Sequence, residues 1–226
     1  MKTINLKKLT SGIICVLLLA LMSACSGNPE QNSDSTGGAL YQSREYNFEF
    51  EYNAAKWVGI DSLTLIDGSI QTDFFEYSAV DSEQIKEQLT VAACIFTHKG
   101  DAENGVIPNF NILITPDTGG TIDDLKSAEA VSALESYLIQ TFAQIGIEPE
   151  IISGTGAKSF GNNEFMVVQV NYTAQESAQR MFQALTIMDG DTVSFTFSCS
   201  PEAIDTHMPD IEQFLSTFKY EVASTK

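Results

Sequence analysis

The sequence predicts a single α+β domain with a mostly antiparallel sheet, and three observations support this prediction. Segments in which apolar and polar residues alternate, as in strands with one buried face, outnumber the helical segments. Two segments carry an apolar stripe at helical spacing and supply helices to cover the sheet. The second half of the chain has the pattern of a β-meander, with short polar turns between successive strands.

The first strands are predicted from residue 46 onward. The segment Tyr46–Tyr52 has aromatic residues at every second position, which indicates a strand with one buried face. A turn or short helix at Asn53–Lys56 then leads to an extended segment at Trp57–Ile60. We expect Trp57, the only tryptophan, to anchor the edge of a core; a ligand platform is the less favoured alternative.

Three more strands are predicted in the middle of the chain, at Ile70–Val80, Leu89–Thr97 and Phe110–Ile114. The second of them is apolar on both alternating faces, which is typical of a central strand covered on both sides. A polar turn or short helix at Asp81–Glu87 and a loop at Gly100–Pro108 separate these strands.

One long helix is predicted over Thr121–Ile145. Its apolar stripe recurs at steps of three and four residues, with one wider gap: Ile122, Leu125, Leu134, Leu138, Phe142 and Ile145. Thr121 and Asp124 resemble a capping box at its start, and Gly146 stands where a left-handed C-cap belongs.

A β-meander and a closing helix complete the domain. The predicted strands are Ile151–Phe160, Glu164–Ala174, Gln179–Met188 and Thr192–Cys199. Asp189-Gly190-Asp191 is a tight hairpin signal, and Cys199 shares the apolar face of its strand. The closing helix is expected to begin at Ser200-Pro201 and to end at Phe218, with Pro209 as a candidate break point.

The first 25 residues have the build of a lipoprotein signal. Three lysines precede the apolar run Gly12–Met22, which is shorter than the roughly 20 residues that cross a hydrocarbon core. Ser23-Ala24-Cys25 resembles the lipobox of bacterial lipoproteins, although Met22 stands where leucine is usual. The resemblance implies that Cys25 is diacylated and becomes the mature N-terminus. The alternative is an ordinary cleaved signal and a free secreted protein.

These features divide the chain into four parts. We expect a signal peptide at residues 1–24, followed by the lipidated cysteine and a flexible, glycine- and serine-rich tether at 25–40. The α+β domain follows at 41–222, with a short tail at 223–226. Two acyl chains suffice for stable anchoring, so the expected location is the extracytoplasmic face of the cell membrane.

The charge balance argues against nucleic acid as a partner. The chain has 12 basic and 30 acidic residues and a net charge of −18, which falls to −21 when the first 24 residues and their three lysines are removed. Such a surface repels phosphate backbones and anionic headgroups, so attachment to the membrane must come from the lipid. We expect the acidic surface to serve solubility; attraction of cations or of a basic protein is the less favoured alternative.

The sequence predicts neither an enzyme nor a cofactor site. A nucleophilic triad needs a base, and the only histidines, His98 and His207, are not accompanied by a G-x-S-x-G motif. An exported hydrolase with another constellation is a third, less favoured hypothesis. The segment Gly154–Ser159 resembles a phosphate loop but lacks its spacing, so it is interpreted as a glycine-rich turn or bulge.

Metal sites are not favoured either. Cys94 and His98 lie about 13 Å apart along one strand, too far to share a zinc ion, and adding Cys199 and His207 would require a coincidence of the fold. Both cysteines are expected to be small buried residues, with a disulfide between them as the alternative.

Three aspartates, Asp117, Asp123 and Asp124, flank a glycine-rich loop before the long helix, without the spacing of an EF-hand. We expect them to cap the helix and interact with its dipole rather than to bind calcium.

The order of the elements resembles the PsbP family. The matching features are the Tyr-x-Phe-x-Phe-x-Tyr strand, Trp57, the long middle helix, the meander and a closing helix that ends in Phe214–Phe218; the resemblance covers Leu40–Val222. It implies an α/β/α sandwich, with helices on both faces of a mostly antiparallel sheet. No functional residue of the family maps onto this chain. Its members act mostly as accessory or binding modules, and many are bacterial lipoproteins.

Together, these inferences predict a non-catalytic accessory or binding module of the bacterial cell envelope, anchored through Cys25, with an envelope protein as the expected partner. The alternative is a small solute- or metal-binding lipoprotein that serves a transporter.

Overall fold

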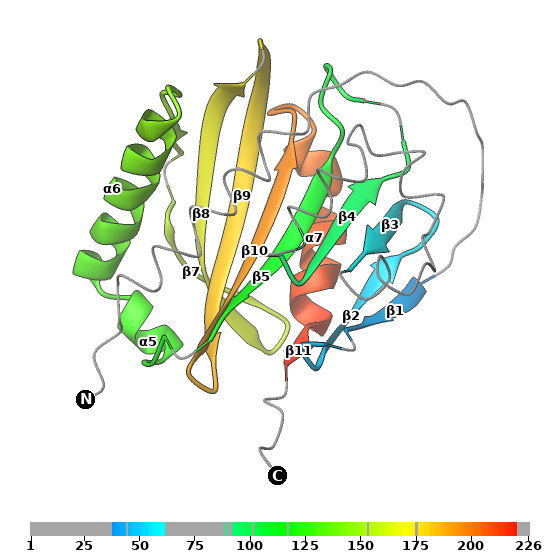
Figure 1. Cartoon of the computed structure of the whole chain (residues 1–226), viewed down its shortest axis with the longest axis horizontal. Helices are drawn as coiled ribbons and strands as arrows, with labels where there is room; N and C mark the ends of the chain where they lie inside the picture. Colours follow the sequence, from blue (N-terminus) through cyan, green and yellow to red (C-terminus); the bar gives the residue numbers. More distant parts are fainter. Residues whose placement is uncertain are drawn as a thin grey trace.

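The computed structural model describes residues 38–220, with the exception of residues 44, 62–88, 90–91, 101, 117, 153 and 175. The described strands form two sheets (Figure 1). The small sheet has the order β1-β2-β11, and its strands are β1 (Gly38–Gln42), β2 (Phe48–Asn53) and β11 (Lys219–Tyr220).

The large sheet has the order β3-β4-β5-β10-β9-β8-β6, and β7 also pairs with β8. Its strands are β3 (Trp57–Ile60), β4 (Cys94–His98), β5 (Asn109–Thr115), β6 (Glu150–Ile151), β7 (Gly156–Phe160), β8 (Asn163–Ala174), β9 (Ser177–Met188) and β10 (Asp191–Cys199). The described helices are α5 (Ile122–Leu125), α6 (Ala128–Gln144) and α7 (Ile204–Thr217). Every pairing between the described strands is antiparallel, which confirms a mostly antiparallel α+β fold.

Alternate residues of the large sheet enter two different cores. On β8, Phe165 and Val167 pack into the aromatic core, which also contains the buried side of α7 and residues of β2. Met166 and Val168 point to the other face and pack into the α6 core, with buried residues of α5 and α6. This alternation is what a strand buried on both faces requires.

The expected cover of helices on both faces is not supported. On one face α7 shares the cover with the small sheet, which contributes Phe48 and Phe50 to the aromatic core. On the other face the α6 core joins α5 and α6 to residues of β8 and β9 (Figure 1). Strands therefore outweigh helices in the described part of the chain, and a second sheet does part of the covering.

The domain begins earlier than predicted. The tether was expected to reach residue 40, but Gly38–Gln42 forms β1 and pairs with β2 along its whole length. Tyr41 explains the difference, because its ring lies 5.2 Å from those of Phe50 and Phe96. The packing of this aromatic residue therefore accounts for a strand in a segment that was predicted to belong to the tether.

Two predicted elements have different lengths in the structure. The central strand predicted over Leu89–Thr97 begins only at Cys94; Ala92 and Ala93 are buried outside the strand. The apolar run there marks burial rather than strand length.

The predicted long helix is two helices, α5 and α6. Ser127 is the N-cap of α6 and accepts a hydrogen bond from the Ala130 N–H at 3.1 Å. Because serine favours such a cap, it starts a new helix within the wide gap between Leu125 and Leu134 of the apolar stripe.

The closing helix differs from its prediction at its start and in its middle. Pro201–Ala203 forms a turn, and α7 begins at Ile204. Pro209 lies inside α7 and does not divide it. The left-handed C-cap predicted at Gly146 is confirmed by a φ of 77°.

The meander is confirmed. The three long strands pair in succession, and Phe195 of β10 lies between Ile112 of β5 and Ala184 of β9. Asp189 and Gly190 have φ values of 53° and 92°, so both central residues of this hairpin are left-handed, as a type I′ turn requires.

Several predictions concern residues outside those the structure describes. They are the signal peptide, Cys25 and most of the tether, the strand Ile70–Val80, the segment Asp81–Glu87, Asp117 and the tail 223–226. Within the described residues, no helix has the length and apolar character needed to span a membrane.

Candidate functional site

Helix α7 separates a buried face from an exposed one. Its buried side chains pack into the aromatic core or its polar margin: Ile204, His207, Asp210, Ile211, Phe214 and Leu215. Pro209, Glu212, Gln213 and Ser216 are spaced by three, four and seven residues and therefore share the other side of the helix. This outer side faces β7.

β7 is an outer strand of the large sheet. Within the described residues it pairs with β8 alone, and Ala157, Lys158 and Ser159 are exposed. Phe160 ends the strand and is buried in the aromatic core, which holds β7 close to α7.

The hairpin between β7 and β8 is fastened to the C-terminal end of α7. The Asn163 side-chain amide donates to the Leu215 and Phe218 carbonyls at 2.9 and 2.8 Å. Gly161 has a φ of 58°, and a Cβ there would lie 3.1 Å from both the carbonyl oxygen and the Cβ of Ser216. The close approach of strand and helix therefore depends on glycine at this position.

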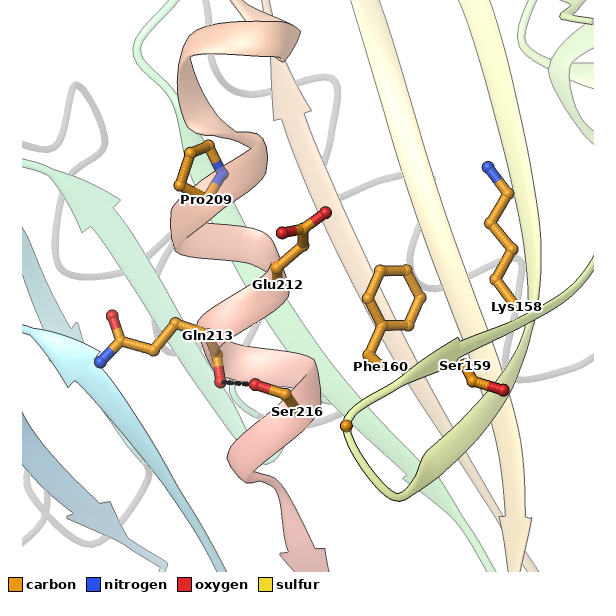
Figure 2. A pocket seen from close by; sticks show the side chains of 8 residues that line it. Lys158, Ser159, Phe160, Pro209, Glu212, Gln213 and Ser216 are labelled. Carbon is orange, nitrogen blue, oxygen red and sulfur yellow. Dashed lines mark hydrogen bonds between the residues drawn. The ribbon is translucent and has the colours of Figure 1, made fainter.

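A groove of about 790 Å³ lies between the outer side of α7 and β7. Figure 2 shows Glu212 and Lys158 on its two walls, with Phe160 between them and the Ser159 side chain directed away from α7. Ser159 therefore lines the groove with its main chain. The Ser216 hydroxyl donates to the Gln213 carbonyl at 3.2 Å, so it is already occupied within the helix.

The buried side of α7 carries a second cluster, which we call the histidine cluster: Lys56, Trp57, His98, Glu103, His207 and Asp210. The His98 and His207 rings lie 5.0 Å apart, and the Trp57 ring lies 5.0 and 5.9 Å from them. Trp57 is 1 % exposed, which confirms its predicted role at the edge of a core.

Asp210 is the polar centre of this cluster. Its buried carboxylate accepts a hydrogen bond from the Trp57 indole N–H at 3.2 Å and lies 3.3 Å from the Lys56 ammonium. A buried carboxylate needs such partners, because an unpaired charge is costly to remove from water. The Glu103 carboxylate lies 3.5 Å from Nε2 of the buried His207.

Both histidines are poor bases in this environment. Burial and the neighbouring His207 lower the pKa of His98 to about 4. Burial also lowers the pKa of His207, against the opposing effects of Glu103 and Asp210. The Gly100 N–H donates to His98 Nδ1 at 3.0 Å, so this nitrogen is an acceptor and the neutral ring carries its proton on Nε2.

The zinc hypothesis gains no support. The fold brings His98 and His207 together, and Cys94 and Cys199 are buried and free in the aromatic core, as the packing interpretation predicted. Burial raises the pKa of both thiols, that of Cys199 to about 12. Among the described residues, no group of three or more histidine, cysteine or acidic side chains is arranged to hold a metal ion.

Of the two aspartates that the structure describes, Asp124 caps the helix as predicted, whereas Asp123 lies in its first turn without capping it. Asp124 accepts a hydrogen bond from the Thr121 N–H at 2.8 Å, and Asp123 pairs with Lys126 at 2.6 Å. The segment Gly154–Ser159 is not the predicted turn or bulge over its whole length, because its residues from Gly156 onward belong to β7.

Sequence analysis missed both the groove and the histidine cluster. The polar residues at helical spacing on the outer side of α7 were visible, but a polar helix face is usually only solvated. Nothing local in the sequence indicated that β7 would lie beside this face.

Comparisons with known proteins give matches among solved structures only. No family model matches the chain, and no curated protein does. Among the solved structures, cyanobacterial PsbP (CyanoP) from Synechocystis has 14% identity and a TM-score of 0.48, covering 86% of this chain and all of that one. LpqN, involved in cell envelope biogenesis of Mycobacterium tuberculosis, has 8% identity and a TM-score of 0.46, covering 80% and 84%.

A protein from Bacteroides thetaiotaomicron has 11% identity and a TM-score of 0.39 over 79% of this chain. The match spans 47% of that longer protein. At these identities and TM-scores the likenesses carry no argument about function.

Proposed function

We propose that this protein is a non-catalytic accessory module of the bacterial cell envelope. It is anchored by lipid at Cys25 on the extracytoplasmic face and binds a partner protein in the groove between α7 and β7. The anchor rests on the lipobox-like segment Ser23-Ala24-Cys25 and on the positive, short apolar stretch before it.

The groove is the observation that carries the binding role. One wall is an exposed helix face and the other an exposed outer strand. The charges on the two walls, Glu212 and Lys158, form no ion pair within the described residues, so they are available to a partner. A surface formed by an exposed strand and a helix suits a polypeptide partner better than an enclosed small molecule.

The second candidate is a small solute-binding lipoprotein that serves a transporter. The volume of the groove favours it, because about 790 Å³ lies within the roughly 300–1,000 Å³ typical of small-ligand sites. Calorimetric titration of the full chain with a metabolite panel, calcium and zinc separates the two functions. Sub-micromolar binding of a small molecule that Glu212→Arg abolishes would favour the second.

The anchor is tested by growing cells that express the full chain with a clickable fatty acid. We expect label in the wild type and none in the Cys25→Ser variant. Label that persists in this variant would contradict the assignment of Cys25 as the acylated residue.

The groove is tested by photo-crosslinking in the same cells. A benzophenone amino acid is placed at Lys158 or Glu212, which stand on the two walls of the groove, and at the exposed α6 residues Ser132 and Gln140 as controls. We expect one discrete protein adduct from both groove positions and none from the controls. Equal adducts at all four positions, or none at the groove, would remove the binding role.

A further inference from the structure

We propose that the bound partner segment is an extended peptide that adds to the outer edge of β7 as a new strand, with an acidic side chain against Lys158 and a basic one against Glu212. This inference rests on the proposed function, because it states how the groove binds its partner. Strand addition of this kind combines main-chain hydrogen bonds with side-chain pockets on alternate residues.

The register of the hairpin shows which main-chain groups of β7 are free. Phe160 pairs with Asn163 across a two-residue turn, so this pair exchanges hydrogen bonds, as do the alternate pairs Lys158↔Phe165 and Gly156↔Val167. The N–H and C=O groups of the residues between them, Ala157 and Ser159, consequently point away from β8.

A bond further along β8 supports this register. The Gln169 carbonyl accepts a hydrogen bond from the Ile152 N–H at 2.8 Å, so the odd-numbered residues of β8 direct their main chain to the side of β7. Phe165 and Val167 belong to the same odd-numbered set.

The outward groups of β7 are accessible. Ala157 and Ser159 are exposed, and β8 is the only strand paired with β7 in the part of the chain that the structure describes. Two donors and two acceptors at alternate positions match the spacing of an antiparallel strand. A β7 of five residues offers about 17 Å of edge at roughly 3.4 Å per residue.

Side chains in the groove determine what kind of peptide fits. Lys158 and Glu212 stand on opposite walls, and each wall therefore selects the opposite charge. Phe160 adds apolar surface between the charges, where an apolar side chain of the peptide can pack.

Lys158 also disfavours a second copy of this chain as the occupant. In an antiparallel pairing of two β7 strands centred on this residue, the two ammonium groups would lie opposite each other. Like charges in that position are destabilising, and lysine on an outer strand is a common device against self-association. The partner must therefore supply a carboxylate there.

The experiment selects decapeptides from a random phage-displayed library on the purified full chain and measures their binding to three variants. Ala157→Pro removes an outward donor without removing a bond to β8, Ala157→Ser keeps the donor, and Lys158→Glu reverses the charge of the strand wall. We expect peptides with both an acidic and a basic residue. Their affinity should fall about tenfold or more with Ala157→Pro and stay within about twofold with Ala157→Ser.

Amide exchange of the unaltered full chain gives a reading that does not depend on the folding of any variant. Bound peptide should slow exchange at Ala157 and Ser159, while Lys158, which already bonds β8, is unchanged. Peptides that bind all variants equally and leave both amides fast would overturn strand addition, as would a library that yields no binder. Crosslinks from Lys158 and Glu212 would still support the groove as a docking site in either case, so the two proposals fail separately.

Discussion

The polar groups on the two sides of α7 lie in opposite environments, buried and paired on one side and exposed on the other. On the inner side, Asp210 accepts a hydrogen bond from the Trp57 indole and lies beside the Lys56 ammonium, and the helix packs on aromatic rings. On the outer side, Glu212 lines an open groove, with Lys158 on the opposite wall.

The difference shows which charges stabilise the protein and which are available for binding. A buried carboxylate with two partners belongs to the stability of the fold, because removing either partner leaves a polar group unsatisfied. The exposed charges of Glu212 and Lys158 on the facing walls contribute little to the stability of the fold, and the space between them is open to a partner. Four experiments can break or sharpen this comparison.

The largest effect is expected for Phe214→Ala. The Phe214 ring is 3 % exposed and lies 4.4 Å from the ring of Phe110, so the substitution removes packing on the inner side of α7. We expect a loss of about 3–5 kcal/mol in the free energy of unfolding. Urea denaturation measures it, with the adjacent Gln213→Ala as the control; equal losses in the two variants would contradict the asymmetry.

The next effect is expected for Asp210→Ala, which leaves the buried Trp57 N–H without its acceptor. We expect a loss of about 1–3 kcal/mol in the free energy of unfolding. Asp210→Asn keeps an acceptor for the indole and should recover part of this loss. If the asparagine variant is as unstable as the alanine variant, the hydrogen bond to Trp57 is not what Asp210 contributes.

Lowering the pH should reduce the free energy of unfolding through the protonation of His98 on the inner side of α7. The pKa of this residue is about 4 in the folded protein, below its ordinary value of 6.5, so the unfolded chain binds the proton first as the pH falls. Its contribution is therefore complete above about pH 6.5, declines between 6.5 and 4, and changes no further below 4.

Urea denaturation of wild type and His98→Gln at several pH values measures this contribution, since the variant lacks it. Fluorescence of Trp57, the chain's only tryptophan and a neighbour of both histidines, reports the cluster directly. Identical pH dependence in the two proteins would show that His98 does not respond as described.

The smallest effect on stability is expected on the outer side. Glu212→Arg and Lys158→Glu alter exposed groups and should change the free energy of unfolding by no more than about 0.5 kcal/mol. Each should nevertheless weaken the binding of the decapeptides selected on the full chain. The double variant places like charges against both the acidic and the basic side chain of the peptide, so binding should be weakest there; restored binding would contradict the proposed charge complementarity.

Much of the fold could be predicted from local patterns. The alternation in Thr192–Cys199 and the turn at Asp189–Asp191 are properties of neighbouring residues, and both are confirmed by the pairing of β10 with β9. Predictions were wrong where the contacts of a single residue decided the local structure. The ring of Tyr41 packs on Phe50 and β1 forms around it, and the N-cap Ser127 begins a second helix.

The candidate site could not be predicted in the same way. Glu212 and Lys158 are ordinary surface charges in the sequence. They stand on facing walls because Asn163 and Gly161 allow the hairpin to lie against the end of α7. The two histidines were considered as zinc ligands with two cysteines, whereas the structure pairs them with Trp57 and Glu103.

By itself, the sequence determined the acidic surface, the meander with its turns, the cap at Gly146 and the expectation of an anchor at Cys25. Charge, alternation and turn chemistry depend on residues within a few positions of one another, so they are visible without a fold. Only the tertiary structure decided that β7 would border α7 and that His98 would meet His207. Contacts between distant segments depend on how whole elements pack, which no short stretch of sequence contains.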